Sequence, residues 1–182
     1  MKSFWLYAAC IILLSGCLDA EKLSLSLDLK SKTAEVGYSN IVSDSKEESK
    51  IKEDFEELIE KAYGDKKDHD GRPGQPISAK LYEEDGHLDG VAVYSFKDSA
   101  QMIKEYEIET DNKGDFILDL GKESNRDLEY AGGNGAYIEE GTKRLIRWSG
   151  NSTSLKVKLR NKLFDSKSKS LLSYWVEWKT PK

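Results

Sequence analysis

The side chains used most often in catalysis are scarce in this chain. Only two cysteines and two histidines occur among the 182 residues, and both cysteines, Cys10 and Cys17, lie within the first 20. His69 and His87 stand in acidic, glycine-flanked segments, with no third ligand at a spacing typical of zinc sites. The Gly-x-Ser-x-Gly pattern of a serine nucleophile is absent. The sequence therefore predicts a protein that is not an enzyme, with surface histidines and no bound zinc. A hydrolase acting through paired carboxylates is the enzymatic alternative.

Three aspartates followed by a glycine form the nearest approach to a metal loop. Asp65, Asp68 and Asp70 precede Gly71, as they would in a calcium-binding EF-hand loop. Counting Gly71 as the sixth position places Lys66 first and Ile77 twelfth, so two of the required oxygen ligands are missing. We therefore expect a solvated turn here, and we expect the protein to carry no metal and no cofactor.

The first 20 residues differ from the rest of the chain in charge and hydropathy. Lys2 is followed by an uncharged apolar run from Phe4 to Leu14, which is too short for a permanent membrane span and is typical of a secretory signal peptide. The run ends at Leu14-Ser15-Gly16-Cys17, which resembles the lipobox of bacterial lipoproteins. The resemblance implies cleavage between Gly16 and Cys17 and a diacylglycerol thioether on Cys17. An uncleaved anchor helix and an ordinary signal peptide are the alternatives.

The lipoprotein resemblance implies a location and a first partner. The lipid on Cys17 would hold the protein on a membrane of the bacterial cell envelope, because two or three buried acyl chains anchor a domain stably. The residue after the cysteine is Leu18 and not an aspartate, which within this class favours the outer membrane if the source is Gram-negative. We therefore divide the chain into a signal peptide (1–16), a lipidated tether (17–22) and one envelope domain (23–182).

The charge balance excludes one large class of partner. The chain has 28 basic and 33 acidic residues, which gives a net charge of -5. Nucleic acid is therefore not expected as the main partner, because neutralising its phosphates requires an excess of basic residues. About a third of the residues are charged and 38% are hydrophobic, as in a well-solvated globular domain.

The patterning predicts an α+β fold. Leucines at 23, 25, 27 and 29 alternate with polar residues, which indicates a half-buried strand, and residues 31–44 are predicted as a loop. An amphipathic helix is expected at about 45–63, with a Ser45–Glu48 capping box and Gly64 at its end. Eight further strands are predicted at 79–83, 90–96, 102–109, 115–120, 136–139, 143–148, 154–159 and 171–178.

Short turns between these segments predict an antiparallel meander of seven to nine strands. The sequence does not decide whether this sheet closes into a barrel. Residues 102–109 fit a helix as well as a strand. In the last strand, 171–178, Tyr174, Val176 and Trp178 would share a buried face, and Trp175 would point outward.

Two features are candidate contacts for a partner. One is the outward Trp175, and the other is the glycine-rich segment of Gly132, Gly133, Asn134 and Gly135, which we expect at a loop tip on the sheet. In part, Gly135, Tyr137 and Trp148 resemble the loop of lipoproteins that inhibit lysozyme. Together these features predict a non-enzymatic binding module for an envelope protein or glycan. The alternatives are a lipocalin-like carrier of a small apolar ligand and a structural lipoprotein without a specific ligand.

Overall fold

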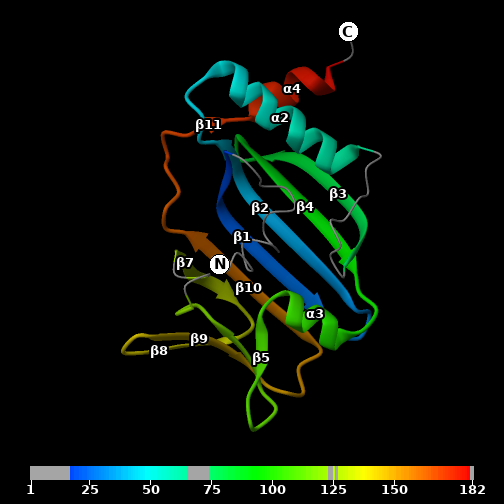
Figure 1. Ribbon diagram of the computed structural model, residues 1–182, viewed down its shortest axis with the longest axis vertical. Coiled ribbons are helices and arrows are strands. Elements are labelled where there is room, and N and C mark those ends of the chain that lie inside the picture. The colour runs from blue at the N-terminus through cyan, green and yellow to red at the C-terminus, as the bar shows by residue number, and fades with distance from the viewer. Residues whose placement is uncertain (1–16, 65–73, 123–124, 126, 181–182) are drawn as a thin grey trace, which may run out of the picture.

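The computed structural model describes residues 17–64, 74–122, 125 and 127–180. In these residues two antiparallel sheets and three helices form the fold (Figure 1). The larger sheet has the strand order β3 (Gln75–Glu84), β4 (His87–Ser95), β2 (Thr33–Ser43), β1 (Leu18–Asp28), β10 (Ser154–Asn161) and β7 (Leu128–Gly133), and β11 (Lys169–Ser170) pairs with β2. The smaller sheet has the order β5 (Ile108–Thr110), β6 (Phe116–Asp119), β9 (Lys143–Trp148) and β8 (Ala136–Glu140).

The α+β prediction is confirmed in its coarse form, as a mainly β fold with antiparallel sheets. The meander is wrong, because β10 inserts between β1 and β7 and the strands divide between two sheets. The larger sheet is not closed into a barrel. It has two free edges, β3 and β7, instead of the enclosed interior that a closed barrel provides.

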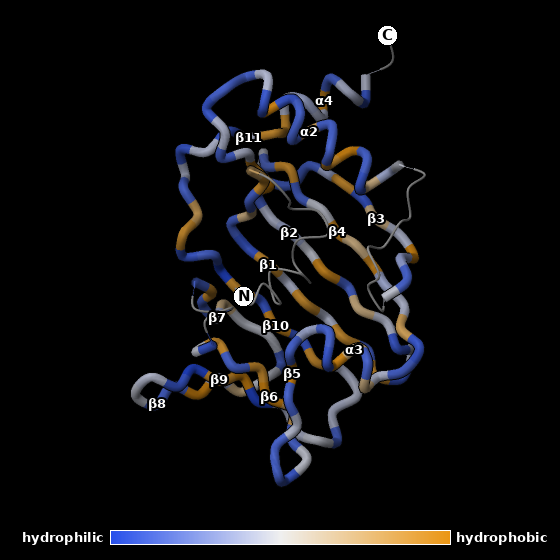
Figure 2. Tube along the Cα trace, viewed as in Figure 1, coloured by the Kyte–Doolittle hydropathy of each residue, from blue (hydrophilic) through white to orange (hydrophobic). Residues whose placement is uncertain are grey.

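The strand predicted from alternating leucines is confirmed and is longer than expected. β1 begins at Leu18, so the segment predicted as a tether is part of the sheet, and Leu18 and Ala20 are buried. Leu23, Leu25 and Leu27 pair with Leu159, Val157 and Leu155 of β10 on one side. On the other side the same leucines pair with Tyr38, Val36 and Ala34 of β2. Figure 2 shows the hydrophobic residues recurring along these strands between hydrophilic ones.

The prediction of a loop at 31–44 is wrong, because this segment contains β2. Most of its polar residues, such as Glu35 and Ser39, belong to the solvent side of a strand whose other side is buried at Ala34, Val36 and Tyr38. Gly37, interpreted as a turn residue, lies inside β2 beside Ser24 of β1: a Cβ at this position would stand 2.4 Å from the Ser24 hydroxyl oxygen.

The long helix forms close to where it was predicted. α2 (Glu48–Tyr63) buries Ile51, Phe55 and Leu58 against the sheet, and Gly64 ends the helix by donating its N–H to the Glu60 carbonyl, 2.8 Å away. The predicted capping box is wrong. Glu47 is the N-cap residue, without a side-chain hydrogen bond, and Ser45 lies before the helix.

Two segments predicted as strands are helical. Residues 102–109 divide into the end of α3 (Ser99–Glu105), whose Met102 is buried, and the short β5. Asp98 starts α3 by accepting a hydrogen bond from the Gln101 N–H at 2.7 Å, and such an N-cap stabilises a helix.

The predicted strand at 171–178 is α4 (Leu172–Lys179). As a result Trp175 is 5% exposed, while Val176 and Trp178 are 46% and 49% exposed, which reverses the predicted faces. Helix spacing explains the reversal, since Leu171 and Trp175 are four residues apart and both enter the core. Tyr174 packs its ring against Phe55 of α2, so that α2 and α4 lie together at one end of the larger sheet (Figure 1).

Candidate ligand site on the larger sheet

The larger sheet has one polar face, which follows from the alternation along its strands and is clearest in β10. In β10, Leu155, Val157 and Leu159 are buried, and the residues between them are exposed. We call the side with these exposed residues the polar face. The registers arrange it in cross-strand rows: Lys158 lies beside Ser24, Ser24 beside Gly37, and Gly37 beside Val91 of β4.

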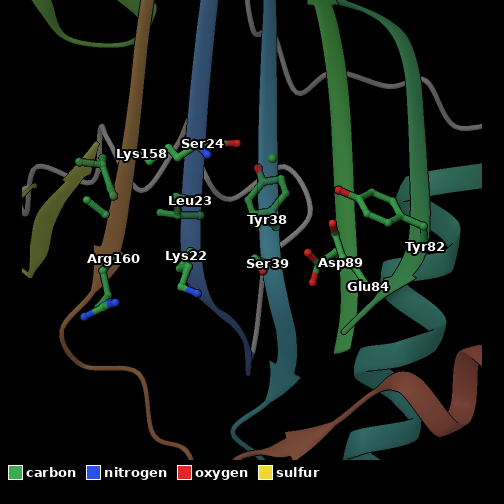
Figure 3. Close-up of a pocket in the computed structure, with 13 residues that line it drawn as sticks. Lys22, Leu23, Ser24, Tyr38, Ser39, Tyr82, Glu84, Asp89, Lys158 and Arg160 are labelled. Atoms are coloured by element: carbon green, nitrogen blue, oxygen red, sulfur yellow. The ribbon is translucent and has the colours of Figure 1, made fainter. Parts of the chain in front are cut away.

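A trough of about 410 Å³ crosses the polar face (Figure 3). Its floor consists of small residues in the middle of the sheet, Ser24, Gly37 and Ser39. Longer side chains stand on both sides because the neighbouring strands carry them at the same level. The hollow therefore results from the order of small and large residues across the strands.

The two walls of the trough differ in charge. Lys22 of β1 and Lys158 and Arg160 of β10 form a cationic wall. Glu84 of β3 and Asp89 of β4 stand on the opposite side. Three strand spacings separate β10 from β4, which places the walls roughly 14 Å apart.

Asp89 of the acidic wall is fixed in place by a hydrogen bond and by burial. Asp89 is buried and accepts the Asn40 N–H at 2.8 Å, at a point where Asn40 adopts a left-handed φ of 57°. Next to it, burial raises the pKa of the Tyr82 phenol above its ordinary value, and the negative charges of Asp89 and Glu84 act in the same direction. Tyr82 is therefore a neutral hydroxyl group at neutral pH and can donate a hydrogen bond into the trough.

A second hollow of about 840 Å³ adjoins the trough at Arg160, which lines both. It is bordered by Glu21, by the exposed His87 and by the segment 162–170 that leads to β11. The side-chain amide of Asn40 donates to Glu21 at 3.2 Å and lowers the pKa of that carboxyl, and the charges of Lys22 and Arg160 add to the effect. Arg160 thus stands in a polar region that is continuous over both hollows.

The glycine-rich segment has a structural role. Gly132 and Gly133 belong to β7, and Asn134 and Gly135 connect this strand of the larger sheet to β8 of the smaller one. Asn134 accepts hydrogen bonds from Trp148 Nε1 at 2.8 Å and from the Lys156 N–H at 2.7 Å, and it donates to the Ser154 carbonyl at 2.9 Å. The segment is therefore the junction between the sheets, and nothing in its geometry tests the predicted contact with a partner.

The other predicted residues are placed as follows. The predicted exposure of Trp175 is wrong, because the side chain is in the core. Cys17 is exposed and precedes β1 directly, while its predicted cleavage partner Gly16 and the candidate calcium loop with Asp65, Asp68, His69, Asp70 and Gly71 lie outside the described residues. Among residues 17–64, 74–122, 125 and 127–180, no group of three or more His, Cys, Asp or Glu side chains could hold a metal ion.

The alternation of residues 23–29 and 154–159 already contained a signal for the trough. Lys156, Lys158 and Arg160 alternate with apolar residues, which predicts that one face of that strand is exposed and cationic. The pairing of this strand with β1 joins segments about 130 residues apart, and the sequence pattern does not reveal this pairing.

Comparison of the chain with family models, with curated proteins and with solved structures finds no match.

Proposed function

We propose that this protein is a non-enzymatic binding module of the bacterial cell envelope, held on the membrane by lipid on Cys17. The observation that carries the proposal is the position of Cys17, which follows the Leu14-Ser15-Gly16 motif and is itself exposed directly before the first strand. The Cys17 carbonyl accepts the Asp44 N–H at 2.7 Å, so this residue is tied to the segment that follows β2. A lipid here would stay outside the core.

The position of the trough supports a binding role away from the lipid. Lys22 and Ser24 follow Cys17 by five and seven residues along β1. At about 3.4 Å per strand residue, they stand roughly 17–24 Å from the attachment point. A ligand in the trough would therefore meet the protein beyond the lipid surface.

Among the helices of the described residues, none has the length and apolar character of a membrane span.

The polar lining of the trough favours a polar ligand on the open sheet over the small apolar ligand of a lipocalin-like carrier. Its walls carry charged and hydroxyl groups, which suit a polar ligand. A carrier of small apolar ligands would instead use an enclosed apolar interior such as a closed barrel provides, and the larger sheet is open. We therefore place the ligand on the polar face.

The anchor is tested by intact mass spectrometry and membrane fractionation in a bacterial host. We expect a mature protein that begins at Cys17 and carries two or three acyl chains. Cys17→Ser should release the protein from the membrane fraction without unfolding it, because the side chain is outside the core. Cys10→Ser is the matched control and should remain acylated. A mature N-terminus other than an acylated Cys17 would contradict the proposal.

A further inference from the structure

The cationic wall continues along β10 beyond the trough. Lys156, Lys158 and Arg160 are all exposed on the polar face, and alternate residues of a strand lie about 6.8 Å apart. Lys22 adds a fourth cation, because it pairs with Arg160 across the two strands. We call these four residues the cationic strip. Its length along β10 is about 14 Å for three charges.

The cations of β10 have no ion pair within the described part of the chain. Lys22 stands 3.6 Å from Glu21, whereas none of Lys156, Lys158 and Arg160 makes a salt bridge to a described carboxylate. Lys156 and Lys158 therefore keep their full capacity to contact anionic groups of a ligand, whereas the charge of Arg160 also acts on Glu21.

Hydroxyl groups and free space border the strip. Ser24 and Ser26 of β1 pair with Lys158 and Lys156, so two hydroxyl donors run alongside the cations. On the other side Lys158 pairs with Gly132, which presents no side chain, and a Cβ built there would meet nothing within 4 Å. A chain-like ligand can therefore lie along β10 without displacing protein side chains.

Carboxylates mark the limits of the strip. Glu35 stands beyond Ser26 on β2, and Asp89 and Glu84 form the far wall of the trough. At the outer edge Glu129 of β7 pairs with Arg160. These charges repel an anionic chain from the rest of the face and leave the direction of β10 as its most favourable path.

We propose that the cationic strip binds a linear anionic polymer of sugar or polyol units, with its carboxylate or phosphate groups along Lys156, Lys158 and Arg160. The proposal deepens the binding function above and rests on it for the envelope setting. Regular cations flanked by hydroxyl donors complement a polymer that repeats both anionic groups and hydroxyls. Neither a neutral glycan nor a cationic ligand would use them.

The test is titration calorimetry on the full-length protein in neutral detergent at low salt. The two probes are a galacturonate decamer and a poly(glycerol phosphate) chain of similar length, which separate carboxylate from phosphate chemistry. We expect at least one to bind, with an affinity that falls steeply between 50 and 200 mM salt because cation–anion contacts release counterions. Lys156→Gln combined with Lys158→Gln should weaken binding about tenfold, from two exposed ion contacts.

Two single variants serve as controls of opposite kind. Lys80→Gln removes a cation from β3, on the far side of the polar face, and should leave the affinity unchanged. Glu129→Gln removes the carboxylate that faces Arg160 and should strengthen binding by up to about fivefold.

Several results would overturn the proposal. These are no binding of either polymer, equal binding by the double variant, or tighter strip-dependent binding of single-stranded DNA or phosphatidylglycerol vesicles. Each can occur with Cys17 acylated, in which case the anchored binding module stands and its ligand class is wrong. If the mature protein carries no acyl chains on Cys17 but still binds the polymer through the strip, the ligand class stands and the lipid anchor is wrong.

Discussion

At the residue scale, Trp175 shows how one helical turn changes the meaning of a side chain. As a strand residue it would point away from Val176 into solvent, whereas in α4 it enters the core and Val176 is exposed. Lys179 lies over its ring, 3.8 Å from the centroid, at the surface side of the helix. The indole is therefore a packing element, and the surface contact predicted from the sequence is not available.

We predict that Trp175→Ala lowers the free energy of unfolding by about 3–5 kcal/mol, because it removes a large buried ring and leaves a cavity. Urea denaturation followed by circular dichroism measures the change. Val176→Ala, in the next position but 46% exposed, should shift it by no more than about 0.5 kcal/mol. Equal effects of the two variants would contradict the buried position of the indole.

A second prediction concerns the carboxyl of Asp111 in the turn between β5 and β6. It accepts the N–H groups of Lys113 at 2.8 Å and Asp115 at 3.0 Å, and Arg147 lies 3.5 Å away. The Lys113 N–H is the largest cause that lowers the pKa of Asp111 below its ordinary 3.8, and the other two groups act in the same direction.

A lowered folded-state pKa means that this carboxylate stabilises the fold above pH 3.8 and loses its contribution as the pH falls through the folded value. We expect an NMR titration to place the Asp111 midpoint below 3.8. Asp111→Asn should flatten the acid limb of stability against pH. A midpoint at or above 3.8 would show that these hydrogen bonds are not made in solution.

At the element scale, a buried polar contact fixes α2 on the larger sheet. The Ser43 hydroxyl at the end of β2 donates to the Asp54 carboxylate of α2, and both residues are buried. The same hydroxyl oxygen accepts the Ser45 N–H at 3.1 Å in the segment before the helix. The segment before α2 and the first half of the helix are therefore both held by one side chain of the sheet.

We predict that Asp54→Ala lowers the free energy of unfolding by about 1–3 kcal/mol, because the Ser43 hydroxyl would stay buried without its acceptor. The effect of Ser43→Ala should be largely absent in the Asp54→Ala background, as a double-mutant cycle by urea denaturation would show. Glu53→Ala, exposed on the same helix, is the control. Additive effects of the two variants would mean that the contact contributes nothing.

The elements predicted correctly from the sequence are those whose pattern is locally complete. The leucines from Leu23 onward alternate through the second half of β1, and Ile51, Phe55 and Leu58 recur over about two turns of α2. The segments predicted incorrectly are short or interrupted. Residues 171–178 are too few to separate the helix period of 3.6 from the strand period of 2, and residues 33–43 contain Gly37 in the middle of the strand. The trough needed the pairing of β1 with β10, a long-range contact that local periodicity does not encode.

At the scale of the whole molecule, the two sheets share one core. The same buried cluster contains Leu155 and Val157 of the larger sheet and Ile146 and Trp148 of the smaller one. Asn134 joins the sheets by accepting from Trp148 Nε1 and from the N–H of Lys156. Next to it, Gly135 lies so close to the smaller sheet that a Cβ would stand 2.6 Å from Ile146 Cγ2 and 2.7 Å from the Trp148 ring.

We therefore predict that Gly135→Ala destabilises both sheets together, by about 1–3 kcal/mol, because the added methyl group overpacks the junction. Hydrogen exchange of the most protected amides in β9 and β10 measures the two sheets separately, and both should lose the same amount of protection if they unfold as one unit. Ala136→Ser, one residue further on and exposed, is the matched control and should change neither. Loss of protection confined to β9 would mean that the smaller sheet unfolds on its own. In that case the polar face of the larger sheet would not depend on the junction at Asn134.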